Sequence, residues 1–243
     1  ITSVGTLTSL NVTGNIVSGN ANLGNLVTAN YFTGNSFTGN SVSIAGDALT
    51  YSLYLNGSSY ITVPSTSADS LLGSGNYTIE FWCKTTDTSW EIFAPDGGVG
   101  PALIISGGVF SFQYQYGVGG PFSYSAGSIT DGSWHHVAVV RNSGTVTLYY
   151  DGVSKNSASD STNYAGQNMT YDIGYGNQSA GRYLDGYLSN FRVLNGTALY
   201  TTNFTPPTGP LTNITNTKLL TFQNSTLIDN SSSARTLGYS GTY

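Results

Sequence analysis

The stretch "DGSWHHVAVVRNSGTVTLYYDGV", residues 131–153, places two alternating apolar segments on either side of a short turn. "WHHVAVVR" and "TVTLYYDG" have the alternation and the Val, Thr and Tyr content of β-strands, and "NSG" between them is typical of a turn. The stretch therefore predicts a β-hairpin. It also contains the chain's 2 histidines, His135 and His136, next to Trp134, so a metal or catalytic role for the pair has to be weighed.

The position of both histidines in a predicted strand makes a metal or catalytic role for the pair unfavourable. Neighbouring side chains in a strand point to opposite faces, so His135 and His136 cannot chelate one metal ion from one face. The chain has 2 His and 1 Cys, so neither a third histidine nor a second cysteine can complete a zinc site. We expect one histidine to pack inward with a satisfied ring nitrogen and the other to face outward. We expect the lone Cys83 to be a buried apolar residue.

Other segments from Ala48 onward repeat the strand pattern. In "NYTIEFWCK" the apolar Tyr77, Ile79 and Phe81 share one face, and in "GGVFSFQYQYG" four aromatic residues do so. Such segments recur about every 8–12 residues, separated by turns, which predicts an antiparallel β-sandwich. The chain, 243 residues long, suits one large all-β domain with a small appendage.

Composition excludes two classes of partner. Charged residues make up 8% of the chain, and 7 basic residues with a net charge of −5 argue against nucleic-acid binding. No apolar run approaches the roughly 20 residues that span a bilayer, so we expect no membrane insertion. The chain begins at Ile1 rather than at a methionine, and we interpret it as part of a longer polypeptide or as a processed product.

Residues 11–40 form a repeat of five residues, "NVTGN IVSGN ANLGN LVTAN YFTGN SFTGN". All but one of the six pentads have an apolar second residue, and all but one end in Gly-Asn, a pair that favours turns. So few repeats cannot cover their own apolar stripe. We therefore expect residues 1–46 to form a β-structured shaft completed by neighbouring chains, with a flexible linker as the alternative.

The motifs from about 50 to 200 together resemble the laminin-G-like, concanavalin A-like jelly-roll family. This resemblance implies an all-β antiparallel jelly-roll sandwich over residues 47–243. Within it, Glu80 is implied as a frame residue that forms hydrogen bonds between strands, and Asp151 and Asp185, each before glycine, are expected to form turns. The residues that carry the signature are Glu80, Trp82, Trp134, His135, His136, Asp151, Gly152, Asp185 and Gly186.

The sequence after residue 193 resembles a segment found in bacteriophage structural proteins. The pentad repeat resembles the shafts of phage tail fibres, which are typically trimeric. In such proteins "KLLTFQNSTLIDNSS", residues 218–232, resembles the first strand of a following domain copy. The same strand can instead pair back into this sandwich, where residues 41–53 supply a first strand poorly. Both alternatives stay open from the sequence.

Enzymatic chemistry finds little support. A retaining glycosidase needs two carboxylates about 5 Å apart, usually at alternate positions of one strand. Among 12 acidic residues no two lie closer than four positions. The two histidines occupy positions where the family uses them structurally, so a lyase base is not apparent. We expect no enzyme activity and no catalytic residue.

Binding is the better-supported function. Aromatic rings stack on sugar rings, and amide side chains meet hydroxyl groups with little need for charge. The candidates for such contacts are Trp90, Tyr124, Tyr175, Tyr114 and Tyr116, each with core or intersubunit packing as the alternative. The resemblance also makes calcium a candidate cofactor, but no local cluster of oxygen ligands indicates where it would bind.

These observations predict a non-enzymatic bacteriophage virion protein, a tail fibre or appendage with a lectin-like domain for a host-surface glycan. Its expected partners are two further copies in a homotrimer, other virion proteins and a cell-surface polysaccharide. The alternatives are a capsid or tail decoration protein that binds no receptor, and a bacterial surface adhesin.

Overall fold

The computed structural model describes residues 51–96, 100–113, 124–166, 168–176 and 182–241, and for residues 113 and 124–128 it describes the backbone only. The predicted shaft over residues 1–46 and the predicted domain start at residue 47 lie outside these ranges. Tyr114 and Tyr116 also lie outside them. The fold below is that of the described part of the chain.

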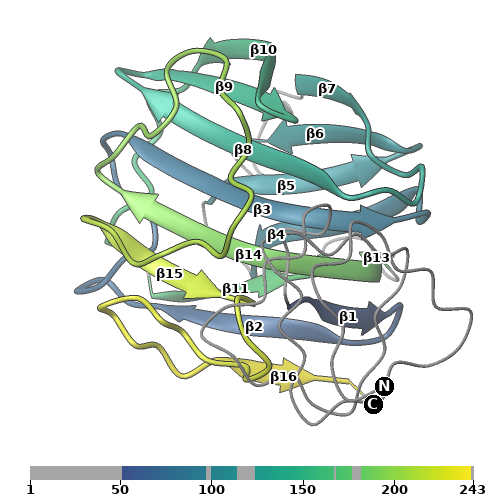
Figure 1. Ribbon diagram of the computed structural model, residues 1–243. Helices are drawn as coiled ribbons and strands as arrows, with labels where there is room; N and C mark the ends of the chain where they lie inside the picture. The colour runs from purple at the N-terminus through teal and green to yellow at the C-terminus, as the bar shows by residue number, and fades with distance from the viewer. Residues whose placement is uncertain (1–50, 97–99, 114–123, 167, 177–181, 242–243) are drawn as a thin grey trace, which may run out of the picture. The chain divides into compact units, whose positions relative to one another are not determined.

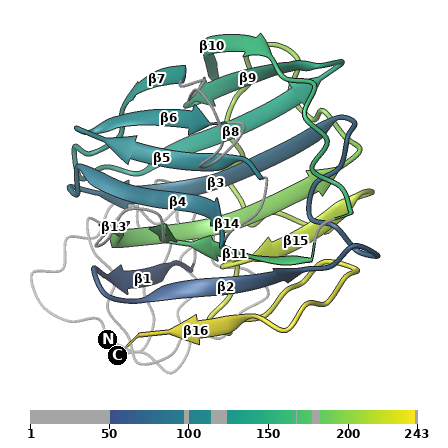
Figure 2. The same ribbon diagram turned by 180° about the vertical axis from the view of Figure 1, so that it is seen from behind.

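Two antiparallel sheets lie face to face (Figures 1 and 2). The sheet called A here runs in the order β1 (Leu53–Asn56), β14 (Asp185–Asn195), β3 (Tyr77–Thr85), β8 (His135–Asn142), β9 (Thr145–Tyr150), β10 (Val153–Ser159), with β15 (Thr217–Thr221) also paired to β14. Sheet B runs in the order β16 (Gly238–Ser240), β2 (Tyr60–Ser65), β11 (Met169–Ile173), β4 (Ser89–Pro95), β5 (Ala102–Ser106), β6 (Val109–Gln113), β7 (Tyr124–Ser128). A small hairpin pairs β12 (Tyr175–Gly176) with β13 (Arg182–Tyr183). This architecture confirms the predicted all-β sandwich.

The predicted hairpin at residues 131–153 is confirmed as β8 and β9. Asn142 pairs with Thr145, and the two residues between them, Ser143 and Gly144, have φ angles of 50° and 80°. Two central residues with positive φ are those of a type I′ turn, whose twist matches that of the flanking strands. Asp151 and Gly152 repeat this geometry between β9 and β10, with φ angles of 49° and 75°. Asp151 is therefore a turn residue, as predicted.

Asp185 corrects the corresponding prediction. It is the first residue of β14 and pairs with Asn56 of β1, so it lies in a strand rather than in a turn. Its neighbour Gly186 packs against β3, where an added Cβ atom would come within 2.7 Å of the Lys84 carbonyl oxygen. The glycine after Asp185 is thus required for close strand packing.

The core lies between the sheets and follows the predicted alternation. Tyr77, Ile79 and Phe81 of β3 point into it, together with Phe110 and Phe112 of β6. Cys83 is also buried there, as expected, and burial raises the pKa of its thiol. Among the described residues no helix has the length and apolar character needed to cross a membrane.

The C-terminal segment completes both sheets. β14 offers one edge to two strands, because β1 pairs with its first residues and β15 pairs with Phe191 to Leu194 (Figure 1). At the edge of sheet B, β16 pairs with β2. Of the two alternatives for the C-terminal strand, pairing back into the same sandwich is therefore the observed one.

Candidate functional site

Among the aromatic residues predicted from the sequence to bind a ligand, the structure describes the side chains of Trp90 and Tyr175. Trp90 lies in β4 with no exposed surface and packs in the core, so of its two alternatives core packing is the observed one. Because its ring has no exposed surface, it is not available to a ligand. The backbone of Tyr124 begins β7, opposite Phe112. Tyr175 is half-buried in β12 and stacks on Tyr183, with ring centroids 4.4 Å apart.

Glu80, His136 and Arg192 form a buried polar cluster on the outer face of sheet A. Arg192 Nε donates to Glu80 Oε1 over 2.8 Å, and the Tyr200 hydroxyl donates to Oε2 over 2.8 Å. His136 Nε2 lies 3.3 Å from the same Oε2. Burial alone would raise the pKa of Glu80, but the hydrogen bond of His136 and the charge of Arg192 outweigh it and lower that pKa. This carboxylate holds strands together, as the family resemblance implied.

His136 also corrects an expectation, because it is fully buried but does not point into the sandwich core. It shares the outer face with Ala138 and Val140, and the segment around Tyr200 and Phe204 covers that face. The Tyr200 and Phe204 rings stack with centroids 3.6 Å apart. A loop folded over the sheet, rather than the second sheet, thus buries this histidine.

His135 points the other way and lies between two carboxylates. Its Nδ1 is 2.9 Å from Asp151 Oδ2, and its Nε2 is 3.0 Å from Asp131 Oδ1. Burial lowers the pKa of His135, but the two carboxylates raise it by more, so the net shift is upward. His135 thereby fixes the start of β8 against the Asp151–Gly152 turn.

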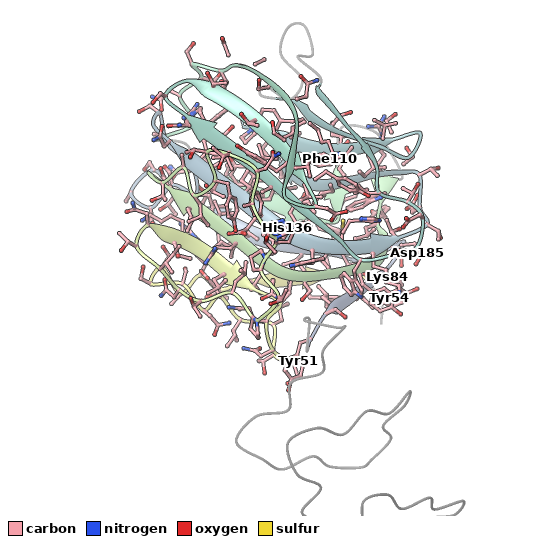
Figure 3. All side chains as sticks on the ribbon, turned by 45° about the horizontal axis from the view of Figure 1, so that its top comes forward. Tyr51, Tyr54, Lys84, Phe110, His136 and Asp185 are labelled. Atoms are coloured by element: carbon pink, nitrogen blue, oxygen red, sulfur yellow. The ribbon has the colours of Figure 1, made fainter. Side chains whose placement is uncertain are left out.

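A surface pocket opens at the end of sheet A, and we call it the tyrosine pocket. It encloses about 630 Å³, within the range of small-ligand sites. Figure 3 shows Tyr54, Lys84 and Asp185 together at this end of the sheet, with His136 nearer its middle. The pocket is lined by Tyr54, Lys84, Thr85, Thr86, Asp87, Gly132, Asp185, Gly186 and Tyr187.

Two exposed tyrosines form its aromatic wall. Tyr54 of β1 pairs with Tyr187 of β14, and their rings lie 4.9 Å apart at 37°. Tyr54 is 49% exposed and Tyr187 is 41% exposed, so both rings are accessible from solvent. Trp134 extends the wall, 6.3 Å from the Tyr187 ring. In the pairing of β14 with β3, Lys84 lies opposite Tyr187, so a cation lies next to the aromatic wall.

Polar groups at the pocket are held in fixed positions. The Tyr54 hydroxyl donates to Asp185 Oδ1 over 2.9 Å, which raises the pKa of Tyr54. The Thr85 hydroxyl donates to the Asp185 carbonyl over 2.6 Å and accepts from the Asp87 N–H over 2.8 Å. Asp87 in turn accepts the N–H groups of Ser89 and of Asp185. The carboxylates therefore have set orientations toward a ligand.

Glycines keep the pocket open. An added Cβ atom at Gly186 would overlap β3, and one at Gly132 would lie 3.3 Å from the Thr86 side chain. The positive φ of Gly132, 80°, further disfavours any other residue. Larger residues at these two positions would push against the β3 end that lines the pocket.

Typical metal-ligating side chains do not gather in the described part of the chain. Within the described ranges no group of three or more His, Cys, Asp or Glu side chains is arranged to hold a metal ion. In the tyrosine pocket the carboxylates of Asp87 and Asp185 accept hydrogen bonds from N–H and O–H donors. Calcium, a candidate from the sequence, stays a prediction, because amide and backbone carbonyl oxygens can also supply its ligands.

Sequence reasoning missed Tyr54 and Tyr187 because it searched for aromatic residues in turn-rich segments. Both lie in strands, between residues that point inward, as in "LYLN" and "DGYLSN". A signal was present: an aromatic residue at the polar phase of an alternating strand points to solvent. Asp185, Gly186 and Trp134 had been singled out, but as parts of the structural signature.

Comparison with known families agrees with this architecture. A laminin-G-type family profile, described as concanavalin A-like lectin/glucanases superfamily, matches residues 55–200. The chain belongs to this superfamily. The matched range holds the whole tyrosine pocket except Tyr54, and it ends before β15 and β16. No curated protein matches the chain significantly.

Several solved structures align with the chain. A protein from Bacteroides ovatus described as a candidate carbohydrate binding protein aligns with 16% identity and a TM-score of 0.56, covering 79% of this chain and 59% of that one. Domains LG4–5 of the mouse laminin α1 chain align with 16% identity and a TM-score of 0.47, over 63% of this chain and 44% of that one. Domain 4 of the arabinanase AbnA from Geobacillus stearothermophilus, in complex with arabinotriose, aligns with 20% identity and a TM-score of 0.44, over 58% and 68%. The chain thus spans less than half of the laminin structure.

Proposed function

We propose that this chain is a non-enzymatic carbohydrate-binding protein and that the tyrosine pocket is its glycan site. The observation that carries the proposal is the exposed pair Tyr54 and Tyr187, whose rings stand beside the oriented carboxylate of Asp185. Aromatic faces pack against the C–H face of a sugar ring, while carboxylates and hydroxyls accept and donate to sugar hydroxyls. The superfamily and the description of the Bacteroides ovatus protein support this choice of ligand.

Neither glutamate of the chain is placed to act on a ligand in the tyrosine pocket. Glu80 is buried against Arg192, and Glu91 is buried with Arg182 Nη1 3.4 Å from its Oε1. A glycosidase acid has to reach the scissile oxygen of a substrate. Neither residue lines the tyrosine pocket.

The biological setting that we propose is a bacteriophage virion, where the chain acts as part of a trimeric tail fibre or appendage and binds a host-surface polysaccharide. This part rests on the sequence alone, on the pentad repeat of residues 11–40 and the segment after residue 193. In a trimer, three weak sites on one stalk would bind a polysaccharide surface with high avidity. Light scattering of the full chain should then give the mass of three chains, and a monomer would contradict the fibre setting.

The test of the glycan site is a printed array of bacterial and plant polysaccharides probed with the labelled full chain. We expect binding to a subset of glycans and a loss of at least about tenfold in the Tyr54→Ala/Tyr187→Ala double variant. Tyr51→Ala is the matched control, since Tyr51 is 44% exposed but does not line the pocket. Binding to no glycan at all would overturn the proposal and favour the decoration protein.

A further inference from the structure

A second aromatic cluster lies beside the tyrosine pocket at the same end of the domain. Tyr175 and Tyr183 of the small hairpin stack at 4.4 Å, and Tyr60 at the start of β2 lies 4.6 Å from Tyr175 and 6.1 Å from Tyr183. All three are half-buried, so part of each side chain faces solvent. Tyr175 was a binding candidate from the sequence, whereas the other two were not.

Burial along residues 183–187 connects this cluster to the pocket. Leu184, Gly186 and Leu188 are buried, while Tyr183, Asp185 and Tyr187 between them are not. These three side chains are thus the solvent-accessible ones of the segment, with Tyr183 at the end of β13 and Asp185 and Tyr187 in the adjoining β14. Tyrosine, aspartate and tyrosine therefore follow one another at intervals of two residues, about 6–7 Å apart.

The opposing segment repeats the arrangement. Tyr54 and Tyr60 flank the turn at Gly57, whose N–H donates to the Leu184 carbonyl over 2.9 Å. Tyr54 belongs to the pocket and Tyr60 to the second cluster. Tyr54 of β1 and Tyr60 of β2 therefore lie on the two sides of this turn, one in each sheet.

The hairpin that carries the second cluster is firmly anchored. Gly176 packs so closely on β4 that an added Cβ atom would overlap the carboxylate of buried Glu91. Arg182, on the partner strand, pairs with that same carboxylate. The rings of Tyr175 and Tyr183 are held by this anchor as well as by one another, which lowers the entropy cost of binding.

We propose that the two aromatic clusters form one strip that binds an extended, largely uncharged glycan of several sugar units, with Asp185 accepting from hydroxyls between the two stacking sites. This inference rests on the proposed function. A single sugar would occupy the tyrosine pocket alone, whereas a longer chain would reach Tyr183 as well. Among the charged residues that line the pocket, the two carboxylates of Asp87 and Asp185 outnumber the one cation, Lys84, which favours a neutral polymer over an acidic one.

The test uses oligomers of increasing length, made by partial hydrolysis of the polysaccharide that binds best on the array, titrated calorimetrically into the full chain. We expect the affinity to rise with length until both clusters are spanned. Tyr183→Ala should lower the affinity for long oligomers by about three- to tenfold and leave that for the shortest unchanged. Tyr187→Ala should weaken binding at every length. Tyr183→Phe, which keeps the aromatic face, should retain the wild-type affinity for long oligomers.

Two outcomes separate this inference from the proposed function. Equal affinities of wild type and Tyr183→Ala at every length would overturn the strip and leave the pocket intact. Absence of any glycan binding would overturn both. Tyr183→Leu serves as a second variant if the alanine variant unfolds, because it fills the space but has no aromatic face. A binding defect of Tyr183→Ala toward every length alike would also contradict the strip.

Discussion

Glu80 of β3 and Arg192 of β14, 112 positions apart, form an ion pair that is almost completely buried. The side chains are 0% and 6% exposed. Both lie beneath the loop that contains Tyr200, which also donates to Glu80. The pair therefore joins two central strands of sheet A to the segment that covers them.

Removing Glu80 should unfold the domain more easily. Glu80→Ala leaves the charge of Arg192 buried without its partner, which typically costs about 3–5 kcal/mol. Urea unfolding of the full chain should show this loss. Lys218→Ala is the control, because its pair with Asp69 is about one-third exposed and is worth about 1 kcal/mol or less. Similar losses in the two variants would contradict the role of the buried pair.

The Gly152 turn is expected to accept no side chain. Gly152 has a φ of 75°, and an added Cβ atom would overlap the Phe204 carbonyl group. Gly166→Ala is a matched control, since its φ is 78° but the space around it is open. Both substitutions cost about 1–2 kcal/mol for the left-handed backbone. Gly152→Ala should lower the melting temperature clearly further, and equal shifts would contradict this.

The segment beyond the family-matched region should contribute to the core. Leu219 of β15 has no exposed surface, so Leu219→Ala should cost about 2–5 kcal/mol in urea unfolding. Ile228→Ala provides the comparison, because that side chain is 42% exposed and its loss should cost about 0.5 kcal/mol or less. A small effect of Leu219→Ala would mean that β15 is not a stable part of the sandwich.

Asp172 should make stability depend on pH. Burial, with the nearby charge of Asp96, raises the pKa of Asp172 from 3.8 to about 7. The folded chain then binds more protons than the unfolded chain between these values, so the free energy of unfolding falls as pH rises from about 4 to about 7. Asp172→Asn should remove this slope. The gain in stability of the variant over wild type should therefore be larger at pH 8 than at pH 5. Parallel pH profiles of wild type and variant, from urea unfolding, would rule the effect out.

The upward pKa shift of His135 adds a separate contribution. The protonated ring is held by Asp131 and Asp151, so its stabilisation is complete below the unfolded pKa of about 6.5. It is lost as pH rises through the higher folded pKa. The Asp172→Asn variant should still lose stability as pH rises above neutrality. The double variant Asp172→Asn/His135→Gln should not show this loss in urea unfolding.

Local patterns explain why so much of the fold was predictable. The hairpin at 131–153, the inward face of β3 and the Asp151–Gly152 turn follow from alternation and turn chemistry, which act over a few residues. The burial of His136 on the outer face of sheet A could not be predicted in this way, because the loop that covers it lies some sixty residues later in the chain. Likewise, Asp-Gly at 185–186 has the composition of a turn, but pairing with β1 and β3 overrides that preference.

The candidate site was harder to predict for the same reason. Tyr54 and Tyr187 come together only through the pairing of β1 with β14, which no local pattern reveals. Trp90 was a binding candidate because "DTSWEIF" contains turn-forming residues, but it is buried in β4, which is its packing alternative. The polar neighbours of Trp90 in the sequence indicated exposure. Its burial depends instead on the face of the strand to which its side chain points.

The most direct measurement of the central claim is a crystal structure of the full chain with an oligosaccharide taken from the best ligand on the array. A sugar ring packed on Tyr54 and Tyr187, with hydroxyls within hydrogen-bond distance of Asp185, is the predicted result. Sugar density at any other surface, with the tyrosine pocket empty, would contradict the account.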